Sequence, residues 1–391
     1  MNINHIINAL GEERSEYFDS VVPPIVQTSN FEFKTVEDFR ACLFNKFDGE
    51  AFLYSRGKNP TLEILQKKCA AMDGAEKSLV CNSGASAIFA ALVSNVTSGD
   101  HIISVKNPYG WAYKILNYFL PRFGVETTFV DGKDVENFYK AIKKNTKLIY
   151  LESPLSWTFE LQDIPAITKW AKENKLITIC DNSYCTPLYQ NTIAMGVDIS
   201  IQSATKYING HCDTLGGVVS GKKEMIKKIF DLDFQATGIA ASPMNAWLML
   251  RGMRTLEVRL ERISRTSHQV IKFLKQHPKV EKILFPFDTD FPQYELAQKQ
   301  MKDAFGLFSI VLKTKKIDEI EKFCERLQHF SLAVSWGGYE SLIMPKCVEI
   351  LNKETFSSRI EEHQLIRIYI GLESAETLIH DLTLSLDKIS D

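Results

Sequence analysis

Short apolar runs alternate with helix-length amphipathic segments through the middle of the chain, from about residue 56 to residue 240. Runs of this length that are rich in β-branched residues are typical of buried strands, and the segments between them suit crossover helices. The alternation predicts βαβ units and a mainly parallel sheet, which is an α/β fold. The expected strands are Lys77–Cys81, His101–Val105, Lys147–Leu151, Leu176–Cys180, Asp198–Gln202 and Gly217–Ser220.

The two ends of the chain show different patterns. Residues 1–55 mix polar and aromatic side chains and predict an extended arm for subunit contacts. A long helical pattern, with apolar positions from Met244 to Phe273, predicts a helix that leads into a smaller α/β domain. We therefore expect an arm over 1–55, a cofactor-binding domain over 56–243 and a C-terminal domain over 244–391. The strands expected in the last domain are Phe305–Leu312, Ser331–Ser335 and Leu365–Ile370.

Composition excludes several classes of partner. The chain has 391 residues, of which 45% are hydrophobic and 24% charged, as in a soluble globular protein. The net charge of −2 does not indicate binding to nucleic acid or to an anionic membrane. No apolar run approaches the roughly 20 residues of a membrane span, and the first ten residues do not resemble a signal peptide.

The cysteines indicate the compartment rather than a metal site. Their spacing contains no CxxC and no regular framework, so buried thiols in a reducing cytoplasm are expected. The eight histidines do not cluster near any pair of cysteines, and we predict no metal site. The cysteines lie at positions 42, 69, 81, 180, 185, 212, 324 and 347.

Candidate chemistry lies where the expected strands end. Ligands of parallel sheets bind beyond the carboxyl ends of the strands, and Asp181 and Lys206 both follow such ends. A lysine there can hold an aldehyde as a Schiff base, and an aspartate can keep a pyridine nitrogen protonated. Together they predict a pyridoxal 5′-phosphate (PLP) site. Taken alone, Lys206 could be an exposed turn lysine and Asp181 could be a helix N-cap.

Small residues after another strand suggest a place for the phosphate. Ser83, Gly84 and Ala85 follow Cys81 and precede a helix expected from Ile88. Amides at the start of a helix attract anions, although an ordinary helix cap is the simpler interpretation of this segment alone. Further hydroxyl donors could come from Ser203 and Thr205.

Two more residues stand out against their surroundings. Tyr109 lies in an Asn-Pro-Tyr-Gly turn after a strand, where its ring could stack on a cofactor or simply pack on the surface. Arg367 interrupts an apolar strand, and a buried arginine needs a carboxylate. That carboxylate could belong to the protein or to a substrate.

Beyond these individual residues, motifs along the whole chain resemble the Cys/Met-metabolism family of PLP enzymes, the cystathionine synthases and lyases and their relatives. The resemblance runs in order and nearly from end to end. The motifs are Tyr54-Ser55-Arg56, Asn59-Pro60-Thr61, Ser83-Gly84, Glu152-Ser153-Pro154, Asp181-Asn182, Ser203-Ala204-Thr205-Lys206-Tyr207, Gly210-His211, Asp213, Arg251-Gly252, Arg254-Thr255-Leu256, Arg367 and Gly371-Leu372-Glu373.

The resemblance implies a fold, an assembly and residue roles. The fold is that of PLP-dependent fold type I, like aspartate aminotransferase, and the assembly is a homotetramer built from dimers. Tyr54 and Arg56 are implied to reach the phosphate of the neighbouring subunit. The resemblance also implies Lys206 as the Schiff-base lysine. It further implies Asp181 on the pyridine nitrogen, Tyr109 stacked on the ring and Arg367 on the substrate carboxylate.

Two stretches are most similar to bacterial cystathionine β-lyases. Ser156 and Trp157 replace the asparagine and proline that are usual in γ-type enzymes, and Trp336 follows Ser335 where those enzymes usually carry leucine. We expect Ser156, Ser335 and Trp336 to contact substrate. Trp111 replaces a cysteine characteristic of methionine γ-lyases. The stretch 181–187, in contrast, is closer to the γ-type enzymes.

The resemblance therefore predicts a carbon–sulfur β-lyase that converts L-cystathionine, a small sulfur amino acid, to homocysteine, pyruvate and ammonia in methionine biosynthesis. Lys206 would be the general base, with Tyr109 or Tyr54 assisting proton transfer. A γ-type enzyme remains the main alternative: a cystathionine γ-lyase, a γ-synthase or an O-acylhomoserine sulfhydrylase. A non-catalytic PLP-binding protein is a minor alternative.

Overall fold

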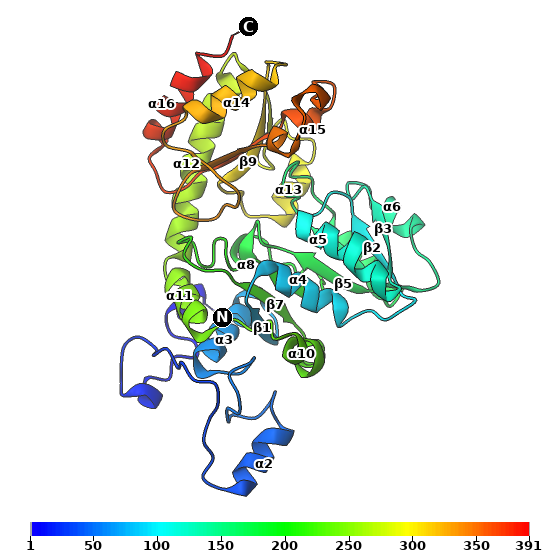
Figure 1. The fold of residues 1–391 in the computed structure, drawn as a ribbon, viewed down its shortest axis with the longest axis vertical. Coiled ribbons are helices and arrows are strands. Elements are labelled where there is room, and N and C mark those ends of the chain that lie inside the picture. The colour runs from blue at the N-terminus through cyan, green and yellow to red at the C-terminus, as the bar shows by residue number, and fades with distance from the viewer. Residues whose placement is uncertain (1, 391) are drawn as a thin grey trace. The chain divides into compact units, whose positions relative to one another are not determined.

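A computed structural model describes residues 2–390, and many of its elements are labelled in Figure 1. The chain forms two compact units. Unit 1 runs to Ser153 and adds Gln162–Asn209 and Asp213–Arg254, whereas unit 2 holds Pro154–Leu161, Gly210–Cys212 and the chain from Thr255 onward. The short inserts mean that the loops after Ser153 and after Asn209 pack with unit 2.

Unit 1 is built on a seven-stranded sheet with the order β1-β7-β6-β5-β4-β2-β3. Its strands are parallel except β7, which is antiparallel to both β1 and β6. The predicted mainly parallel sheet is confirmed, but the sequence pattern missed β3 and did not reveal the reversed direction of β7. The strands are β1 Lys77–Cys81, β2 His101–Val105, β3 Glu126–Val130, β4 Thr146–Glu152, β5 Ile177–Asp181, β6 Ile199–Gln202 and β7 Gly217–Gly221.

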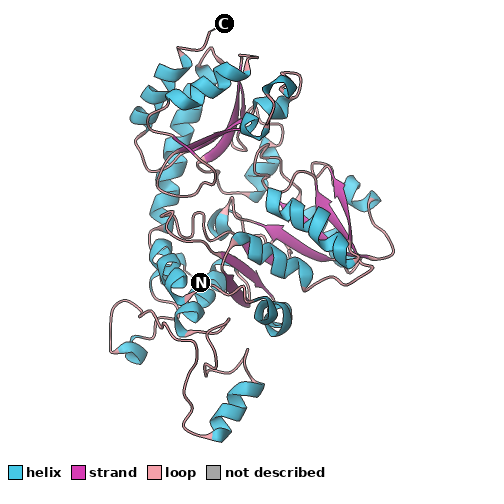
Figure 2. Ribbon diagram, viewed as in Figure 1, coloured by secondary structure: helices cyan, strands magenta, loops and turns pink. Residues whose placement is uncertain are grey.

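Helices cover this sheet (Figure 2). α4 packs on β6 and β7 and contributes Ala87, Ile88 and Ala91 to the main apolar core. α3 packs on β1 and β7, and α7 on β5. The helices are α3 Pro60–Asp73, α4 Gly84–Val93, α5 Gly110–Lys114, α6 Glu136–Lys140, α7 Ile164–Glu173, α8 Thr186–Tyr189, α9 Lys223–Ile229, α10 Gln235–Thr237 and α11 Pro243–Met253, with shorter turns at Ile115–Phe119, Leu120–Phe123 and Phe230–Phe234.

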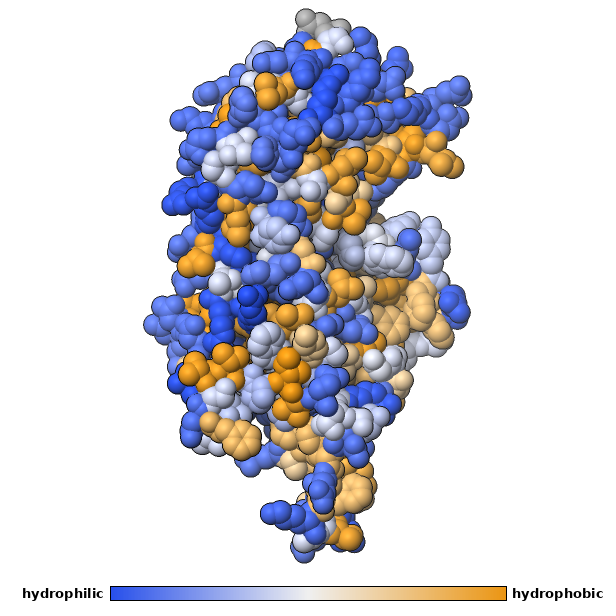
Figure 3. All heavy atoms as spheres, turned by 60° about the vertical axis from the view of Figure 1, so that its left-hand side comes forward, coloured by the Kyte–Doolittle hydropathy of each residue, from blue (hydrophilic) through white to orange (hydrophobic). Residues whose placement is uncertain are grey.

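The N-terminal segment carries little regular structure. It contains α1 (Ile3–Asn8), a 3₁₀ turn (Arg14–Tyr17) and α2 (Val36–Phe44). Hydrophobic side chains on and before α2 are exposed, including Phe18 and Phe44, and orange side chains gather around the α2 end in Figure 3.

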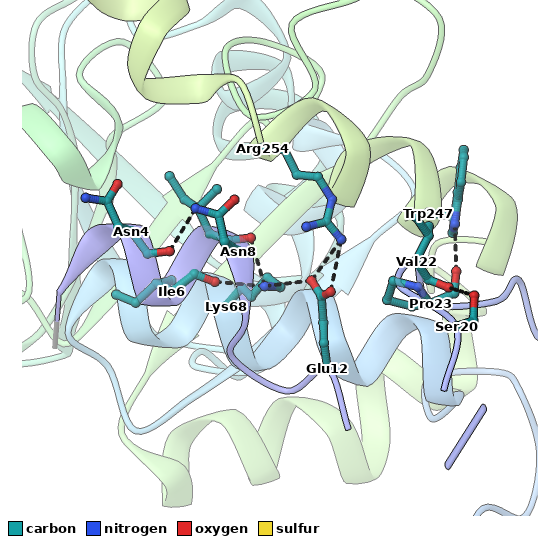
Figure 4. Close-up of polar contacts among 11 residues, drawn as sticks. Asn4, Ile6, Asn8, Glu12, Ser20, Val22, Pro23, Lys68, Trp247 and Arg254 are labelled. Carbon is teal, nitrogen blue, oxygen red and sulfur yellow. Dashed lines mark hydrogen bonds and ion pairs between the residues drawn. The ribbon is translucent and has the colours of Figure 1, made fainter. Parts of the chain in front are cut away.

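The first residues of the segment are nevertheless tied to the rest of unit 1 (Figure 4). Buried Lys68 of α3 lies 3.0 Å from Glu12, which also bonds Arg254, and the indole of Trp247 donates to the carbonyl of Pro23.

Unit 2 contains a five-stranded sheet with the order β10-β11-β12-β9-β8. The helical pattern from Met244 to Phe273, predicted as one helix, is two helices, because Thr255 (φ −108°, ψ 9°) leaves helical geometry between α11 and α12. The expected strand at Ser331–Ser335 is shortened to two residues. The elements are α12 Leu256–Gln276, β8 Val280–Leu284, α13 Tyr294–Gln300, β9 Leu307–Leu312, α14 Ile317–Arg326, β10 Ser331–Leu332, β11 Leu342–Pro345, α15 Glu361–Gln364, β12 Ile366–Tyr369 and α16 Ala375–Leu386, with 3₁₀ turns at Lys346–Glu349 and Lys353–Thr355.

Candidate active site

The carboxyl edge of the unit 1 sheet brings together residues from separate parts of the sequence. Glu152 ends β4 and Asp181 ends β5, and the two are directly opposite each other in the parallel register. The turn that carries Lys206 follows β6, the next strand, and the Lys206 amide donates to the carbonyl of Ser203 at 3.0 Å. Thr205 fixes this turn, because its side chain accepts a hydrogen bond from the Gly216 amide at 3.0 Å.

Asp181 is buried and strongly oriented. One oxygen of its carboxylate accepts bonds from the Ser183 amide at 3.0 Å and from the Ser183 hydroxyl at 2.6 Å. Burial raises the pKa of Asp181, and this desolvation outweighs the opposing effects of the Ser183 hydrogen bonds and of the Lys206 charge. The helix that follows begins at Thr186, so Asp181 is not its N-cap. A bound cation or a protonated ring nitrogen would offset the cost of burying this carboxylate.

The predicted phosphate segment starts a helix earlier than expected. α4 begins at Gly84 rather than at Ile88, with Ser83 as N-cap accepting from the Ser86 amide at 3.1 Å. Within residues 2–390, the amides of Gly84 and Ala85 have no hydrogen-bond acceptor. A Cβ on Gly84 would lie 2.7 Å from the Ser203 hydroxyl oxygen, so only glycine allows this helix end to approach the Ser203 turn. Donor amides beside a hydroxyl fit a phosphate group.

Tyr109 is held at the same edge through its backbone. Its amide donates to Oε2 of Glu152 at 2.5 Å, and α5 begins at the next residue. The side chain is 41% exposed. The backbone of Tyr109 is therefore anchored to the end of β4.

Tyr54 and Arg56 lie in the N-terminal segment. The Arg56 guanidinium carbon is 5.6 Å from the Tyr54 ring centroid, and Tyr54 is 49% exposed. Arg56 lines a pocket of about 370 Å³ together with Ser29, Ser55 and residues 240–243. In the part of the chain that the structure describes, neither side chain bonds to the residues at the sheet edge.

Unit 2 contains the four remaining predicted residues. Arg367 lies on β12, is 9% exposed, and its guanidinium carbon is 4.7 Å from the ring centroid of Trp157, the neighbour of Ser156. Ser335 (φ 80°) and Trp336 begin a loop that is pinned to the end of β12. The pinning bonds run from the Tyr369 hydroxyl to the Gly338 carbonyl, from the Gly371 amide to the Ser341 hydroxyl and from the Leu372 amide to the Tyr339 carbonyl, at 2.8, 2.9 and 2.8 Å.

The sequence matches the family described as Cys/Met metabolism PLP-dependent enzyme over residues 5–387. The chain belongs to this family. It is 38% identical over 379 residues to an L-methionine gamma-lyase of Treponema denticola, covering 95% of this chain and 94% of that protein. It is 34% identical over 375 residues to the cystathionine beta-lyase MetC of Bacillus subtilis, covering 95% and 93%.

A solved structure is similar over its whole length. A Campylobacter jejuni protein with a provisional assignment as O-acetylhomoserine (thiol)-lyase superposes with a TM-score of 0.91 at 27% identity, covering 99% of this chain and all of that one. That structure contains a pyridoxyl-lysine phosphate. The predicted family, fold type and cofactor are therefore confirmed: this family member is a PLP-dependent enzyme.

The sequence analysis gave no role to three candidate residues of this family member. Glu152, named there only within a motif, accepts a bond from the Tyr109 amide. Ser183 links Asp181 to the Ser203 turn through a 2.6 Å bond from the Ser203 amide, and the Trp157 ring contacts Arg367. The register of two adjacent strand ends could have indicated Glu152. The links of Ser183 and Trp157 depend on side-chain geometry, which the sequence pattern does not carry.

Cysteines and charges elsewhere add little to the site. Seven cysteines are buried as predicted, but Cys212 is exposed, and its thiol lies 2.7 Å from Glu340. Among residues 2–390, no three His, Cys, Asp or Glu side chains are placed to share a metal ion. No helix in the same range is both long and apolar enough to cross a membrane.

Proposed function

We propose that this protein is a carbon–sulfur lyase that cleaves L-cystathionine by β-elimination. The observation that carries the proposal is the shared sheet edge, where buried Asp181 lies close enough to Lys206 for the lysine charge to act on its pKa. The stretches around Ser156 and Trp336 favour the β-type reaction, and Trp111, which is 55% exposed, replaces the cysteine of methionine γ-lyases. A β-lyase name among the relatives agrees with this choice.

The residues at the sheet edge would hold the cofactor. Gly84 and Ala85 amides, with the hydroxyls of Ser83, Ser203 and Thr205, would bind its phosphate. Asp181 would hold the proton on its ring nitrogen, and Tyr109 would stack on its ring. When bound there, PLP supplies an electron sink for the carbanion that forms at Cα of the substrate.

The proton transfers are assigned to side chains of this chain. Lys206 Nζ would remove the Cα proton of the substrate as general base. Tyr109, with Tyr54 as the alternative, would donate a proton to the leaving thiolate, so that homocysteine departs. The remaining three-carbon fragment reacts with water to give pyruvate and ammonia. Arg367 would hold the substrate carboxylate, while Ser156, Ser335 and Trp336 would line the substrate site.

A second candidate is γ-elimination from L-methionine. Relatives of 34–38% identity from Treponema denticola, Fusobacterium nucleatum and Porphyromonas gingivalis are named L-methionine gamma-lyase. This reaction requires a second proton removal, at Cβ, and Lys206 could perform both. Loss of the cysteine at Trp111 argues against it.

Assembly and compartment are also proposed. We infer a cytoplasmic homotetramer built from dimers, in which Tyr54 and Arg56 bind the phosphate of the neighbouring subunit. Mixing Arg56→Ala subunits with Lys206→Ala subunits would then restore part of the activity in hybrids. Hybrids that are verified by mass but have no activity would contradict the shared site.

The deciding experiment identifies the keto acid. PLP-loaded enzyme is given L-cystathionine and, separately, L-methionine, with the Lys206→Ala variant as control. Pyruvate with homocysteine supports the β-lyase. 2-Oxobutyrate, formed with cysteine from cystathionine or with methanethiol from methionine, supports the γ-type enzyme. No keto acid from either substrate would contradict both candidates.

A further inference from the structure

Trp157 makes contacts that give it a part in substrate binding. We infer that Trp157 is a positioning residue, which holds the Arg367 guanidinium flat and aims its N–H groups at a substrate carboxylate. The inference rests on the proposed function in one respect, the assignment of Arg367 as the carboxylate ligand. It adds a residue and a specific interaction that the proposed function does not contain.

The indole of Trp157 contacts two cations. The Arg367 guanidinium carbon lies 4.7 Å from the ring centroid, and Lys346 Nζ lies 4.6 Å from it. Arg367 is opposite Met344 in the antiparallel register of β11 and β12, and Lys346 begins the 3₁₀ turn directly after β11. The Trp157 indole therefore contacts one cation from β12 and one from the turn after β11.

The charge on Lys346 is balanced within the protein. Its ammonium lies 2.8 Å from Glu349, and its side chain is only 16% exposed. Lys346 is thus committed to Glu349 and to the indole. Arg367 is the cation of the pair whose planar group suits bidentate binding of a carboxylate.

The loop that carries Trp157 is fixed by its own bonds. The Leu155 amide donates to the Glu160 carbonyl at 3.1 Å, which closes the loop around Trp157. Gln293 fixes the C-terminal end of this loop, because its side-chain amide both accepts from and donates to the backbone of Leu161 at 2.8 Å. Phe159 is fully buried beneath the loop. A half-buried indole on such a loop is held in place before any ligand arrives.

Stacking suits a guanidinium that must also bind a ligand. A cation over an aromatic face is attracted to the ring without using its in-plane N–H groups for that contact. Arg367 has a long side chain with several rotamers, so an indole that selects one of them removes part of the entropy lost on binding. The benefit applies only to ligands that carry a carboxylate.

The test compares two ligands that differ only in that group. Glycine is methylamine with an added carboxylate, and both react with PLP through the amine. Their Kd values are measured by spectral titration of PLP-loaded wild-type enzyme and of Trp157→Ala, Trp157→Phe and Trp170→Ala variants. Trp170 of α7 packs against Tyr139, and its replacement controls for the loss of an indole elsewhere. Thermal melting checks that each variant folds.

We expect wild-type enzyme to bind glycine more tightly than methylamine. Trp157→Ala should reduce the ratio of the Kd for methylamine to the Kd for glycine about tenfold. Trp157→Phe keeps an aromatic face and should retain the wild-type ratio within about threefold, as should Trp170→Ala. An unchanged ratio in Trp157→Ala, an equal loss of affinity for both ligands, or no preference for glycine in wild-type enzyme would each overturn the inference. If the Trp157→Ala variant does not fold, the comparison of Trp157→Phe with Trp157→Leu decides instead. The phenylalanine variant must retain the ratio, and the leucine variant must lower it.

The product assay separates this inference from the proposed function. If the ratio behaves as expected but no thioether is cleaved, the role of Trp157 stands and the lyase proposal fails. If cystathionine is cleaved but the ratio does not depend on Trp157, the lyase proposal stands and the positioning role is wrong.

Discussion

The backbone amide of Tyr109 is bonded to the carboxylate of Glu152 at 2.5 Å. Glu152 ends β4, and β4 lies between β2, the strand before Tyr109, and β5, the strand that ends at Asp181. One carboxylate thus couples the turn of the predicted stacking residue to the strand end beside the predicted pyridine ligand. The position of the Tyr109 ring depends on a residue with no assigned part in the chemistry.

Replacing Glu152 should weaken cofactor binding in a graded way. Glu152→Ala removes the acceptor of the Tyr109 amide, and the expected rise in the Kd for PLP is about tenfold, since a hydrogen bond to a charged group is worth about 1.5 to 3 kcal/mol. Glu152→Gln retains a side-chain oxygen and should raise the Kd by less than about threefold. The measurement is PLP titration of apoenzyme. Equal Kd values for the alanine variant and wild type would remove Glu152 from the site.

Replacing Lys206 tests the central assignment. Lys206→Ala should abolish the visible absorbance of the lysine-bound cofactor and lower turnover by about 10² to 10⁴, the usual contribution of a general base. Noncovalent PLP should still bind, because the amides of α4 and the Ser203 turn are unchanged. Absorbance spectra and keto-acid release are the measurements, and exposed Lys222→Ala is the control. A variant with normal spectrum and turnover would contradict the whole mechanism.

Much of unit 1 could be predicted from sequence because its strands are short, continuous and buried. β1 and β2 match the predicted bounds, and the motifs located Asp181 and Lys206 at one edge. The direction of β7 was not predictable, since an apolar run has the same pattern in either direction. β3 was missed because its burial is only partial.

Side-chain links were harder to predict than strands. Ser183 joins Asp181 to the Ser203 turn, but a serine two residues after an aspartate is also common in ordinary turns. Trp157 could be recognised as unusual at its position, yet its contact with Arg367 joins residues 210 positions apart only through the folding of unit 2.

Asp73 should make stability depend on pH. This residue at the end of α3 is buried against the sheet, where Ser200 and Gln202 donate to one of its oxygens at 3.2 and 3.4 Å. Hydrogen bonding by Ser220 also acts to lower the pKa of this carboxyl. Desolvation by burial nevertheless outweighs these three side chains and raises the pKa of Asp73 from 3.8 to about 6.

The folded state binds this proton more tightly than the unfolded state does. The free energy of unfolding should thus fall as pH rises from about 4 to 6, by roughly 3 kcal/mol from this group, and then level off. Asp73→Asn should remove that fall and be more stable than wild type at pH 7.5. Urea unfolding at pH 4.5, 6 and 7.5 measures the effect.

Asp303 provides a control of opposite sign. Burial acts to raise its pKa, but bonds from His268, Ser264 and the Ala304 amide together hold the pKa below 3.8. Asp303→Asn should therefore destabilise the protein at pH 7.5, and this loss should shrink only as pH falls below about 3.8, through the lowered pKa of the folded state. If Asp73→Asn gave the same sign of change as Asp303→Asn at pH 7.5, the account of Asp73 would be wrong.

Glu12 should be worth far more to stability than an exposed ion pair. The side chains of Glu12 and Lys68 are 2% and 1% exposed, and Lys68 also donates to the carbonyls of Ile6 and Ile7 (Figure 4). Burial is the main reason that the pKa of Lys68 is lowered, against the effect of Glu12. Glu12→Ala leaves this ammonium buried without its carboxylate and should cost about 3–5 kcal/mol of unfolding free energy.

The double variant Glu12→Ala/Lys68→Met distinguishes a buried charge from a general loss of packing. Removing the ammonium should restore at least about 2 kcal/mol, because the only cation then left without Glu12 is Arg254, whose side chain is 30% exposed. Lys67, the neighbour of Lys68, forms an exposed ion pair with Glu63. Lys67→Met breaks this pair and should change stability by less than about 0.5 kcal/mol. Chemical unfolding of all three variants provides the comparison. A double variant that is no more stable than Glu12→Ala would show that Glu12 acts through packing of the N-terminal segment and not by neutralising Lys68.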